Sequence, residues 1–217
     1  MSSMNLQRRA ILAPFIRDGR VDYEALSQRL DVDALIDDIA GRDLSRATRE
    51  EQLAFYLNAY NLLTLQQVLQ RLRRDRNWAG PVSLPDKLRF FLLRRHRVAG
   101  ARMSLLGLEN TVIRRRFRDP RIHFALNCAS SSCPHLPGML FVAEELDADL
   151  ERLTAQFIGS GEVRYDAAHN RLSVSPIFRW YRRDFTPSVS AFIARYRDVP
   201  ADATLVFHGY DWRLNRR

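Results

Sequence analysis

The segment TREEQLAFYLNAYNLLTLQQVLQRL, residues 48–72, decides the fold expected for this chain. Thr48 and Glu51 have the spacing of a capping box, which begins a helix. Apolar residues then follow at helical spacing and fill most of the remaining circumference, so this helix is predicted to lie inside the core. Asn58 and Asn61 are three residues apart on it. Because buried amides need hydrogen-bond partners, these two either fix a loop or line a site.

The chain as a whole has the composition of an ordinary globular protein. It has 217 residues, of which 46% are hydrophobic and 27% are charged. We expect residues 1–10 to form an N-terminal tail and residues 11–217 a single domain. Helical and strand patterns alternate without an internal repeat, which predicts an α+β fold with helices packed on a small, mainly antiparallel sheet. Such a fold is compatible with a thiol hydrolase.

Local patterns predict several further elements. Short amphipathic helices are expected between residues 22 and 40 and a longer one at 143–158, and Ser104 is a candidate helix N-cap. A hairpin is expected to turn near Gly100, and another between residues 163 and 174. Alternation and β-branched or aromatic residues predict strands at 121–127 and 204–215.

The chain carries a net charge of +9, and Lys87 is the only lysine among its 34 basic residues. Arginines cluster at residues 71–76, 94–97, 114–118 and 179–183. Such clusters can bind an acidic partner. The chain has no zinc-finger spacing, RNP-type motif or basic zipper, so we expect no specific nucleic-acid partner.

The N-terminal region has only a short apolar run at residues 10–16, which Pro14 interrupts. It lacks the apolar core and cleavage site of a secretory signal, and 18 apolar residues nowhere follow one another. We therefore expect no transmembrane segment and a cytoplasmic location. The two cysteines of the chain are expected to be reduced in that compartment.

Both cysteines and two of the five histidines lie in the segment RIHFALNCASSSCPHLPG, residues 121–138. Cys133 is the better candidate nucleophile, because it lies in a serine-rich turn that Pro134 fixes and where backbone N–H groups can bind an oxyanion. Cys128 at the end of the predicted strand is interpreted as a core residue. On a regular strand, His123 and Cys128 would point to opposite faces, so His123 and the distant His208 both remain candidate bases.

A metal site is an alternative interpretation of this segment. Cys128, Cys133 and His135 are weak candidate ligands, because structural zinc normally has four ligands in closely spaced pairs. A disulfide between the cysteines is geometrically possible but is disfavoured in the expected compartment. No glycine-rich nucleotide motif and no metal motif occurs, so no cofactor is expected.

Five motifs in order resemble the DUF547 family of uncharacterised bacterial and plant proteins: DGRVDYEAL, EQLAFYLNAYNLLTL, the segment from SLLGLEN to NCASSSCPHL, SPIFRWYRRDF and YDWRLN. The resemblance extends from about Ile11 to Asn215. It implies that the Ser-Cys-Pro turn with Cys133, the pair Asn58 and Asn61, and Glu109 are family features. The final motif matches at Tyr210, Asp211, Trp212, Leu214 and Asn215. The chain has Asn110 where the family usually has a histidine, while His123 matches a frequent family histidine.

Two functions are compatible with these residues. The first is a cysteine-dependent hydrolase or acyltransferase for a small-molecule or peptide substrate, with Cys133 as the nucleophile and His123 or His208 as the base. Asn58 or Asn61 would position the substrate or bind the oxyanion, and Glu109 or Asp211 would orient the base. The second is a non-catalytic binding or scaffold module, in which the Asn, Glu and Asp side chains form a buried network and the arginines bind an acidic partner.

Overall fold

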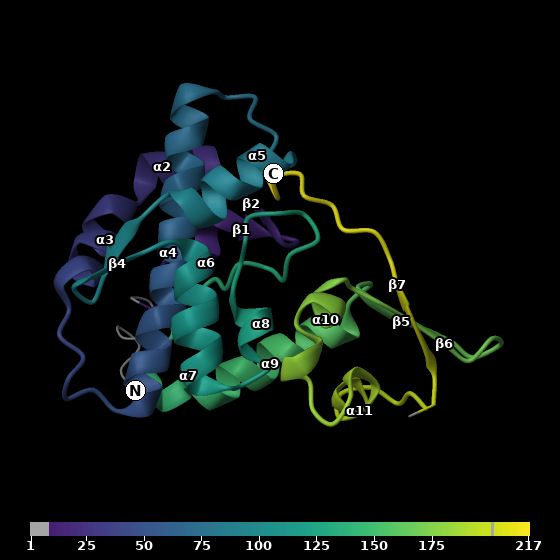
Figure 1. Ribbon diagram of the computed structural model, residues 1–217. Helices are drawn as coiled ribbons and strands as arrows, with labels where there is room; N and C mark the ends of the chain where they lie inside the picture. The colour runs from purple at the N-terminus through teal and green to yellow at the C-terminus, as the bar shows by residue number, and fades with distance from the viewer. Residues whose placement is uncertain (1–8, 201) are drawn as a thin grey trace.

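The computed structural model describes residues 9–200 and 202–217, and its longest element is the predicted central helix α4 (Arg49–Arg74). Figure 1 shows α4 running through the larger part of the molecule, with several other helices on its sides. The Thr48 side chain accepts a hydrogen bond from Glu51 N, and Glu51 accepts one from Thr48 N. The capping box and the burial of this helix are both confirmed, and the fold is α+β.

Loss of this cap gives a first prediction. Thr48→Ala is expected to reduce the free energy of unfolding by about 1 kcal/mol, because it leaves an orphan N–H at the start of α4. Ser27→Ala is the matched control, since Ser27 is an exposed hydroxyl that caps no helix. Urea denaturation measures both variants. Equal stability losses in the two would contradict a specific role for the cap.

The N-terminal elements lie against one side of α4. They are η1 (Ala13–Phe15), β1 (Ile16–Arg17), β2 (Arg20–Val21), α2 (Tyr23–Arg29) and α3 (Val32–Gly41). α3 packs against α4. The expected tail 1–10 falls mostly outside the described residues. At its described end, the Arg9 side chain donates to Leu140 O and forms ion pairs with Glu145 and Asp149.

A second group of elements packs on another side of α4. It comprises α5 (Leu84–Lys87), η2 (Leu88–Leu93), β3 (His96–Val98), β4 (Ala101–Met103), α6 (Leu105–Gly107), η3 (Leu108–Arg114) and α7 (Arg115–Phe117). The predicted hairpin is confirmed, with Val98 opposite Ala101. Ser104 is the predicted N-cap and accepts a hydrogen bond from Gly107 N. η2 and η3 are both π-helical.

The predicted strand at residues 121–127 is wrong. These residues form a short helix, α8 (Ile122–Ala125), which ends where Leu126 is extended. All four residues of α8 are buried. A short, continuously buried run does not reveal its period, so strand and helix cannot be distinguished by pattern alone. Asp119 helps to start the helical turn, because its carboxylate accepts a hydrogen bond from Arg121 N.

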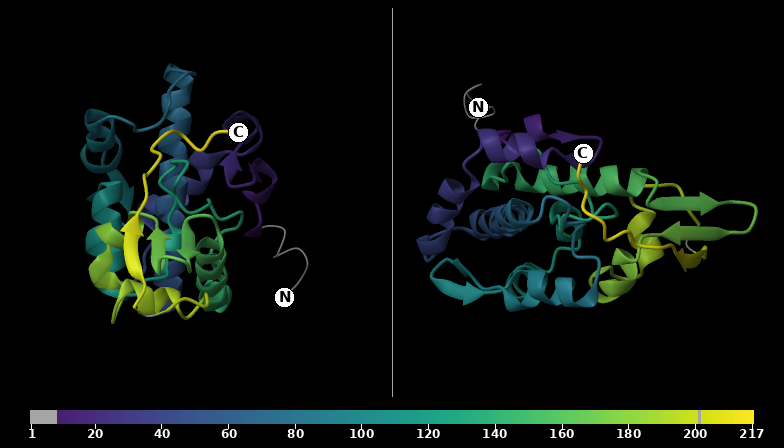
Figure 2. Two further views of the ribbon diagram at one scale, coloured as in Figure 1. Left: turned by 90° about the vertical axis from the view of Figure 1, so that its right-hand side faces the viewer. Right: turned by 90° about the horizontal axis from the view of Figure 1, so that it is seen from above.

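The C-terminal half forms a second packed region. It contains η4 (Ala143–Glu145), α9 (Leu146–Gly159), β5 (Val163–Asp166), β6 (Arg171–Val174), α10 (Ile177–Trp180), η5 (Arg182–Asp184), α11 (Val189–Ile193) and β7 (Thr204–Phe207). Figure 2 shows the three-stranded sheet at one end of the molecule. β5 and β6 are antiparallel, whereas β6 and β7 are parallel, so this sheet is mixed. Five phenylalanines form the core behind it: Phe124, Phe157, Phe178, Phe185 and Phe192.

The predicted strand at 204–215 is confirmed only over β7. From His208 onward the chain leaves the sheet and returns to the first half of the molecule, past α5 in Figure 1. There Leu214 N donates to Ala79 O, and Asn215 N donates to Ala129 O. Val21 N in turn donates to Asn215 O. The C-terminal segment therefore lies directly beside the cysteine-bearing turn.

Candidate active site

The cysteine-bearing segment opens onto a cavity of about 270 Å³ between η2, η3, α10 and the C-terminal segment. Most of its wall is apolar, with contributions from Leu88, Phe91, Leu92, Leu106, Ile177 and Trp180. Its polar groups include Tyr60, Glu109, His123, Cys128, Cys133 and Tyr210. A mostly apolar cavity on which a few polar and nucleophilic side chains converge is the preferred candidate for an active site.

Both π-helical segments contribute to this cavity. η2 supplies Leu88, Phe91 and Leu92 to the wall, and η3 supplies Glu109. Turns with π-helical geometry are rare in proteins and occur frequently at functional sites. The irregular helices are therefore concentrated around the cavity that holds the thiols.

The turn after Cys128 has unusual backbone geometry. Ala129 has a φ of 63°, in the left-handed region that residues other than glycine seldom adopt. Asn127 stabilises this turn, because its Oδ1 accepts from Ala129 N at 2.9 Å and its Nδ2 donates to Pro134 O at 2.7 Å. Such strained residues cluster at active sites, where the surrounding structure compensates their cost of about 1–3 kcal/mol.

Cys128 is partly exposed, and hydroxyl groups surround its sulfur. Its Sγ lies 3.0 Å from Ser130 Oγ and 3.3 Å from Tyr210 OH. A hydrogen bond with the Cys133 thiol, together with those from Ser130 and Tyr210, outweighs burial and lowers the pKa of Cys128 to about 7. A thiol with this pKa is substantially ionised at neutral pH, and the thiolate is the reactive form.

Cys133 has the opposite environment. It is buried, and its Sγ accepts a hydrogen bond from Cys128 N at 2.9 Å. Burial, followed by the neighbouring Cys128, raises the pKa of the Cys133 thiol. The two free thiols therefore differ: Cys128 favours the thiolate, and Cys133 favours the protonated form.

His123 faces the cavity from α8 and has a fixed orientation. Its Nε2 lies 2.7 Å from Asp184 Oδ2, and its ring stacks on Tyr181 with the centroids 4.0 Å apart. Asp184 also accepts two hydrogen bonds from Arg114. Burial raises the pKa of Asp184, but the hydrogen bonds from His123 and Arg114 outweigh burial and hold this pKa below its ordinary value. The ionised carboxylate accepts a hydrogen bond from Nε2–H, and Nδ1 makes no hydrogen bond with any described residue.

Glu109 lies in the same cavity but contacts tyrosines rather than His123. Tyr60 OH donates to its Oε2 at 3.3 Å, and Tyr181 also hydrogen-bonds to it. Burial, and then the charge of Glu109, raise the pKa of both Tyr60 and Tyr181. Both phenols are therefore protonated donors at neutral pH. Glu109 thus orients Tyr181, the ring against which His123 stacks.

The two α4 amides bind backbone groups rather than lining the cavity. Asn61 Nδ2 donates to Ala125 O at 2.9 Å, and its Oδ1 accepts from Asn127 N at 2.9 Å. Asn58 makes the equivalent pair of bonds with the N and O of Phe141. Neither residue contributes to the wall of the thiol cavity. Asn61 instead connects α4 to the segment that carries Cys128.

The structure does not bring His208 or Asp211 to the cavity. His208 Nε2 lies 3.1 Å from Glu162 O and 3.5 Å from Glu162 Oε2, beside the three-stranded sheet. Asp211 forms a local ion pair with Arg213. Hydrogen bonds from Arg213 keep the pKa of Asp211 below its ordinary value. Of the two candidate bases, only His123 shares a cavity with the thiols.

The expected weak metal ligands are also separated. Cys128 and Cys133 line the cavity, whereas His135 is exposed and lies over Gly19, where an added Cβ would fall 2.2 Å from its Nε2. In residues 9–200 and 202–217, no group of three His, Cys, Asp or Glu side chains has an arrangement suited to a metal ion. Over the same residues, no helix is both long and apolar enough to cross a bilayer.

Ser130 and Asp184 were not singled out from the sequence, and Tyr210 was named only as part of the final family motif. Ser130 and Tyr210 contact Cys128, and Asp184 contacts His123. Tyr210 belongs to the YDWRLN motif, which was a signal that could have suggested a place in the site. Asp184 lies in an arginine-rich segment, and nothing in its local pattern indicates a histidine partner 61 residues away.

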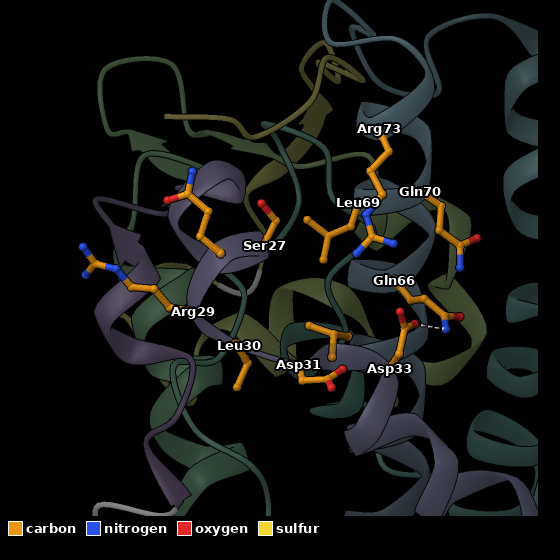
Figure 3. A pocket seen from close by; sticks show the side chains of 11 residues that line it. Ser27, Arg29, Leu30, Asp31, Asp33, Gln66, Leu69, Gln70 and Arg73 are labelled. Carbon is orange, nitrogen blue, oxygen red and sulfur yellow. Dashed lines mark hydrogen bonds between the residues drawn. The ribbon is translucent and has the colours of Figure 1, made fainter.

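A second cavity, of about 390 Å³, lies between α4 and the helices α2 and α3. Figure 3 shows its polar side chains, including Arg29, Asp31 and Arg73. Asp33 accepts a hydrogen bond from Gln66 across it at 2.6 Å. No cysteine or histidine lines this described part of the surface. The thiol cavity is therefore the candidate active site, although it is the smaller of the two.

The fold and this site define an α+β protein in which two free thiols and a histidine line an aromatic cavity, with Asp184 holding the histidine from outside it. The chain belongs to the DUF547 family, whose model, described as a protein of unknown function, matches residues 44–158. The match contains Glu109, His123, Cys128 and Cys133. Comparison with curated proteins and with solved structures gives no match.

Proposed function

We propose that this protein is a cysteine-dependent acyl-transfer enzyme, a hydrolase or acyltransferase, in which Cys128 is the nucleophile. One observation carries the proposal: the Cys128 sulfur lines an apolar cavity while the hydroxyls of Ser130 and Tyr210 lie at hydrogen-bond distance. These contacts stabilise a thiolate where an acyl substrate can be desolvated. The nucleophile that the sequence favours, Cys133, becomes the thiol that supports Cys128.

The proposed reaction has two steps, acylation of Cys128 and deacylation. In the first, the Cys128 thiolate forms a bond to the acyl carbonyl carbon, the bond to the leaving group breaks, and His123 protonates the leaving group. In the second, His123 accepts a proton from water or another acceptor, which attacks the thioester and releases the Cys128 thiolate. Asp184 holds the imidazole by its Nε2, so Nδ1 is the atom that exchanges protons. Because Cys128 and His123 make no direct hydrogen bond, the substrate or a water connects them.

The remaining residues of the site have positioning roles. Asn61 holds the backbone of residues 125 and 127, and Asn127 holds the strained turn at Ala129. Glu109 fixes Tyr181 behind the imidazole. We further propose the cytoplasm as the compartment of the reaction, because both thiols are free and a reducing environment keeps them so.

Acylation by an activated ester tests this function. Native protein treated with p-nitrophenyl acetate is expected to gain one acetyl group on Cys128, located by peptide mass. Cys128→Ala is expected to abolish this modification, and His123→Gln to slow turnover about 100-fold, the usual magnitude for loss of a general acid–base. His169→Gln is the matched control, since His169 is an exposed histidine of the β5–β6 turn. Full turnover in Cys128→Ala would refute the proposal.

A binding or scaffold role is the second candidate, and one observation favours it. Asn58 and Asn61 each bind two backbone groups. These bonds fix the packing of α4 against distant segments and require no catalytic role. In this role the exposed arginines would bind an acidic partner. Equal and slow reaction of both cysteines with thiol reagents would favour this role.

A further inference from the structure

The exposed apolar side chains of this protein gather at the thiol cavity. Among the described residues, the large hydrophobic side chains classed as exposed are Val82, Leu84, Leu88, Leu92, Leu93, Leu106 and Trp180. Leu88, Leu92, Leu106 and Trp180 line the cavity itself, and the other three lie in the segment that leads to or follows its wall. A concentration of exposed apolar surface at one place marks a site where an apolar ligand or surface is bound.

The distribution of polar groups along the cavity is uneven. Cys128, Glu109 and His123 are contributed by the segments that pack on α4, whereas Leu88 and Leu92 on η2 form the exposed side. Lys87 lies beside them, with its ammonium 4.0 Å from the centroid of the Trp212 ring. A ligand that fits this arrangement has one polar, reactive end and one apolar end. A peptide would require hydrogen-bond partners for its backbone along the wall, and leucine side chains offer none.

We propose that the cavity takes an aliphatic acyl chain of medium length, with the carbonyl carbon at Cys128 and the chain along Leu88, Leu92 and Leu106. This inference rests on the proposed function, because it names the substrate of the same nucleophile. The volume of about 270 Å³ lies just below the range of about 300–1,000 Å³ typical of ligand pockets. It therefore suits a medium-length chain, with the exposed leucines covering the part that extends beyond the cavity.

Thioesters of N-acetylcysteamine with acyl chains from acetyl to dodecanoyl are the test substrates. The Cys128 thiolate takes the acyl group, and the thiol of N-acetylcysteamine leaves with a proton from His123. Full burial of each methylene corresponds to about four-fold in affinity. Because this cavity is open on one side, we expect the second-order rate constant to rise about two-fold per methylene, or roughly 60-fold between acetyl and octanoyl.

Two neighbouring leucines provide matched variants. Leu92 lines the cavity, whereas Leu93 is more exposed, at 64% against 39%, and lies outside it. Leu92→Gln is expected to reduce the octanoyl-to-acetyl ratio of rate constants at least five-fold, and Leu93→Gln to leave it unchanged. An equal effect of both variants would show that the apolar surface, and not the cavity, selects the chain, and would overturn the inference.

A ligand-binding measurement on a variant that cannot react distinguishes this inference from the proposed function. In Cys128→Ser, a fluorescent medium-chain fatty acid is expected to bind and octanoate to displace it, with Leu92→Gln weakening both. If the fatty acid binds but no thioester modifies native Cys128, the acyl site is supported and the proposed function is refuted. If all thioesters modify Cys128 at one rate and no fatty acid binds, the function stands and the acyl site is refuted.

The same acyl group can come from a soluble thioester or from a lipid. Octanoyl thioester in solution and dioctanoyl phosphatidylcholine in micelles are therefore compared in parallel. Acylation of Cys128 by the thioester alone would support a soluble donor, and acylation by both would support a site that also takes its chain from a lipid surface. Acylation by neither, with acetyl thioester still active, would overturn the inference.

Discussion

Iodoacetamide is expected to alkylate Cys128 at least about three-fold faster than Cys133 at pH 7. With its pKa lowered to about 7, Cys128 has roughly 15 times the thiolate fraction of an ordinary thiol of pKa about 8.5. The lower intrinsic nucleophilicity of such a thiolate removes about five-fold of that advantage. The pKa of Cys133 is raised and its side chain is buried, so both its ionisation and its accessibility are small.

The pH dependence of this reaction follows from the same shift. The Cys128 rate should rise with pH, pass its midpoint near pH 7 and become level above about pH 8, because deprotonation creates the reactive form. Tyr210→Phe and Ser130→Ala each remove a hydroxyl close to the sulfur, so each should move the midpoint to higher pH. Ser131→Ala is the matched control, since its hydroxyl donates to Arg213 O and not to the thiol.

Site-resolved peptide mass across pH provides the measurement. Cys133 and Tyr60 share the cavity with Cys128, and their raised pKa values keep both protonated near the midpoint. The midpoint shift in the hydroxyl variants separates the direct contacts from these neighbours. Equal alkylation of both cysteines, or faster reaction at Cys133, would contradict the assignment of the nucleophile.

Asn61→Ala is expected to lower the free energy of unfolding by about 2–6 kcal/mol. The substitution leaves Ala125 O and Asn127 N without partners, and both residues are buried. An unsatisfied buried polar group costs about 1–3 kcal/mol, and two are created here. Denaturant unfolding followed by circular dichroism measures the loss.

Asn58→Ala is the matched control for this variant. Asn58 makes the same two types of bond three residues earlier on α4, but it is partly exposed. Water can replace its amide, so we expect about 1 kcal/mol or less. Asn61→Ala should also reduce the difference in reactivity between Cys128 and Cys133, because it releases the segment before the strained turn. Similar stability in both variants would argue against the structural role assigned to Asn61.

The elements that short-range patterns specify were predicted well. The capping box at Thr48 and Glu51, the buried α4, the hairpin before Ser104 and the helix α9 each depend on residues within a few positions of one another. Their hydrogen bonds close locally, so periodicity and capping residues are sufficient to place them. The sequence also shows that both cysteines and two of the histidines lie within residues 121–138.

The arrangement of the site depends on long-range contacts, which local patterns do not encode. Tyr210 reaches Cys128 from 82 residues away, and Asp184 reaches His123 from 61 residues away. Because α8 is a helix rather than a strand, the argument that separated His123 from Cys128 no longer applies. Sequence alone establishes that two thiols and a histidine lie in one segment. The packing of the C-terminal segment and η5 against that segment establishes their different environments, because a thiol's pKa depends on the donors and burial that distant residues provide.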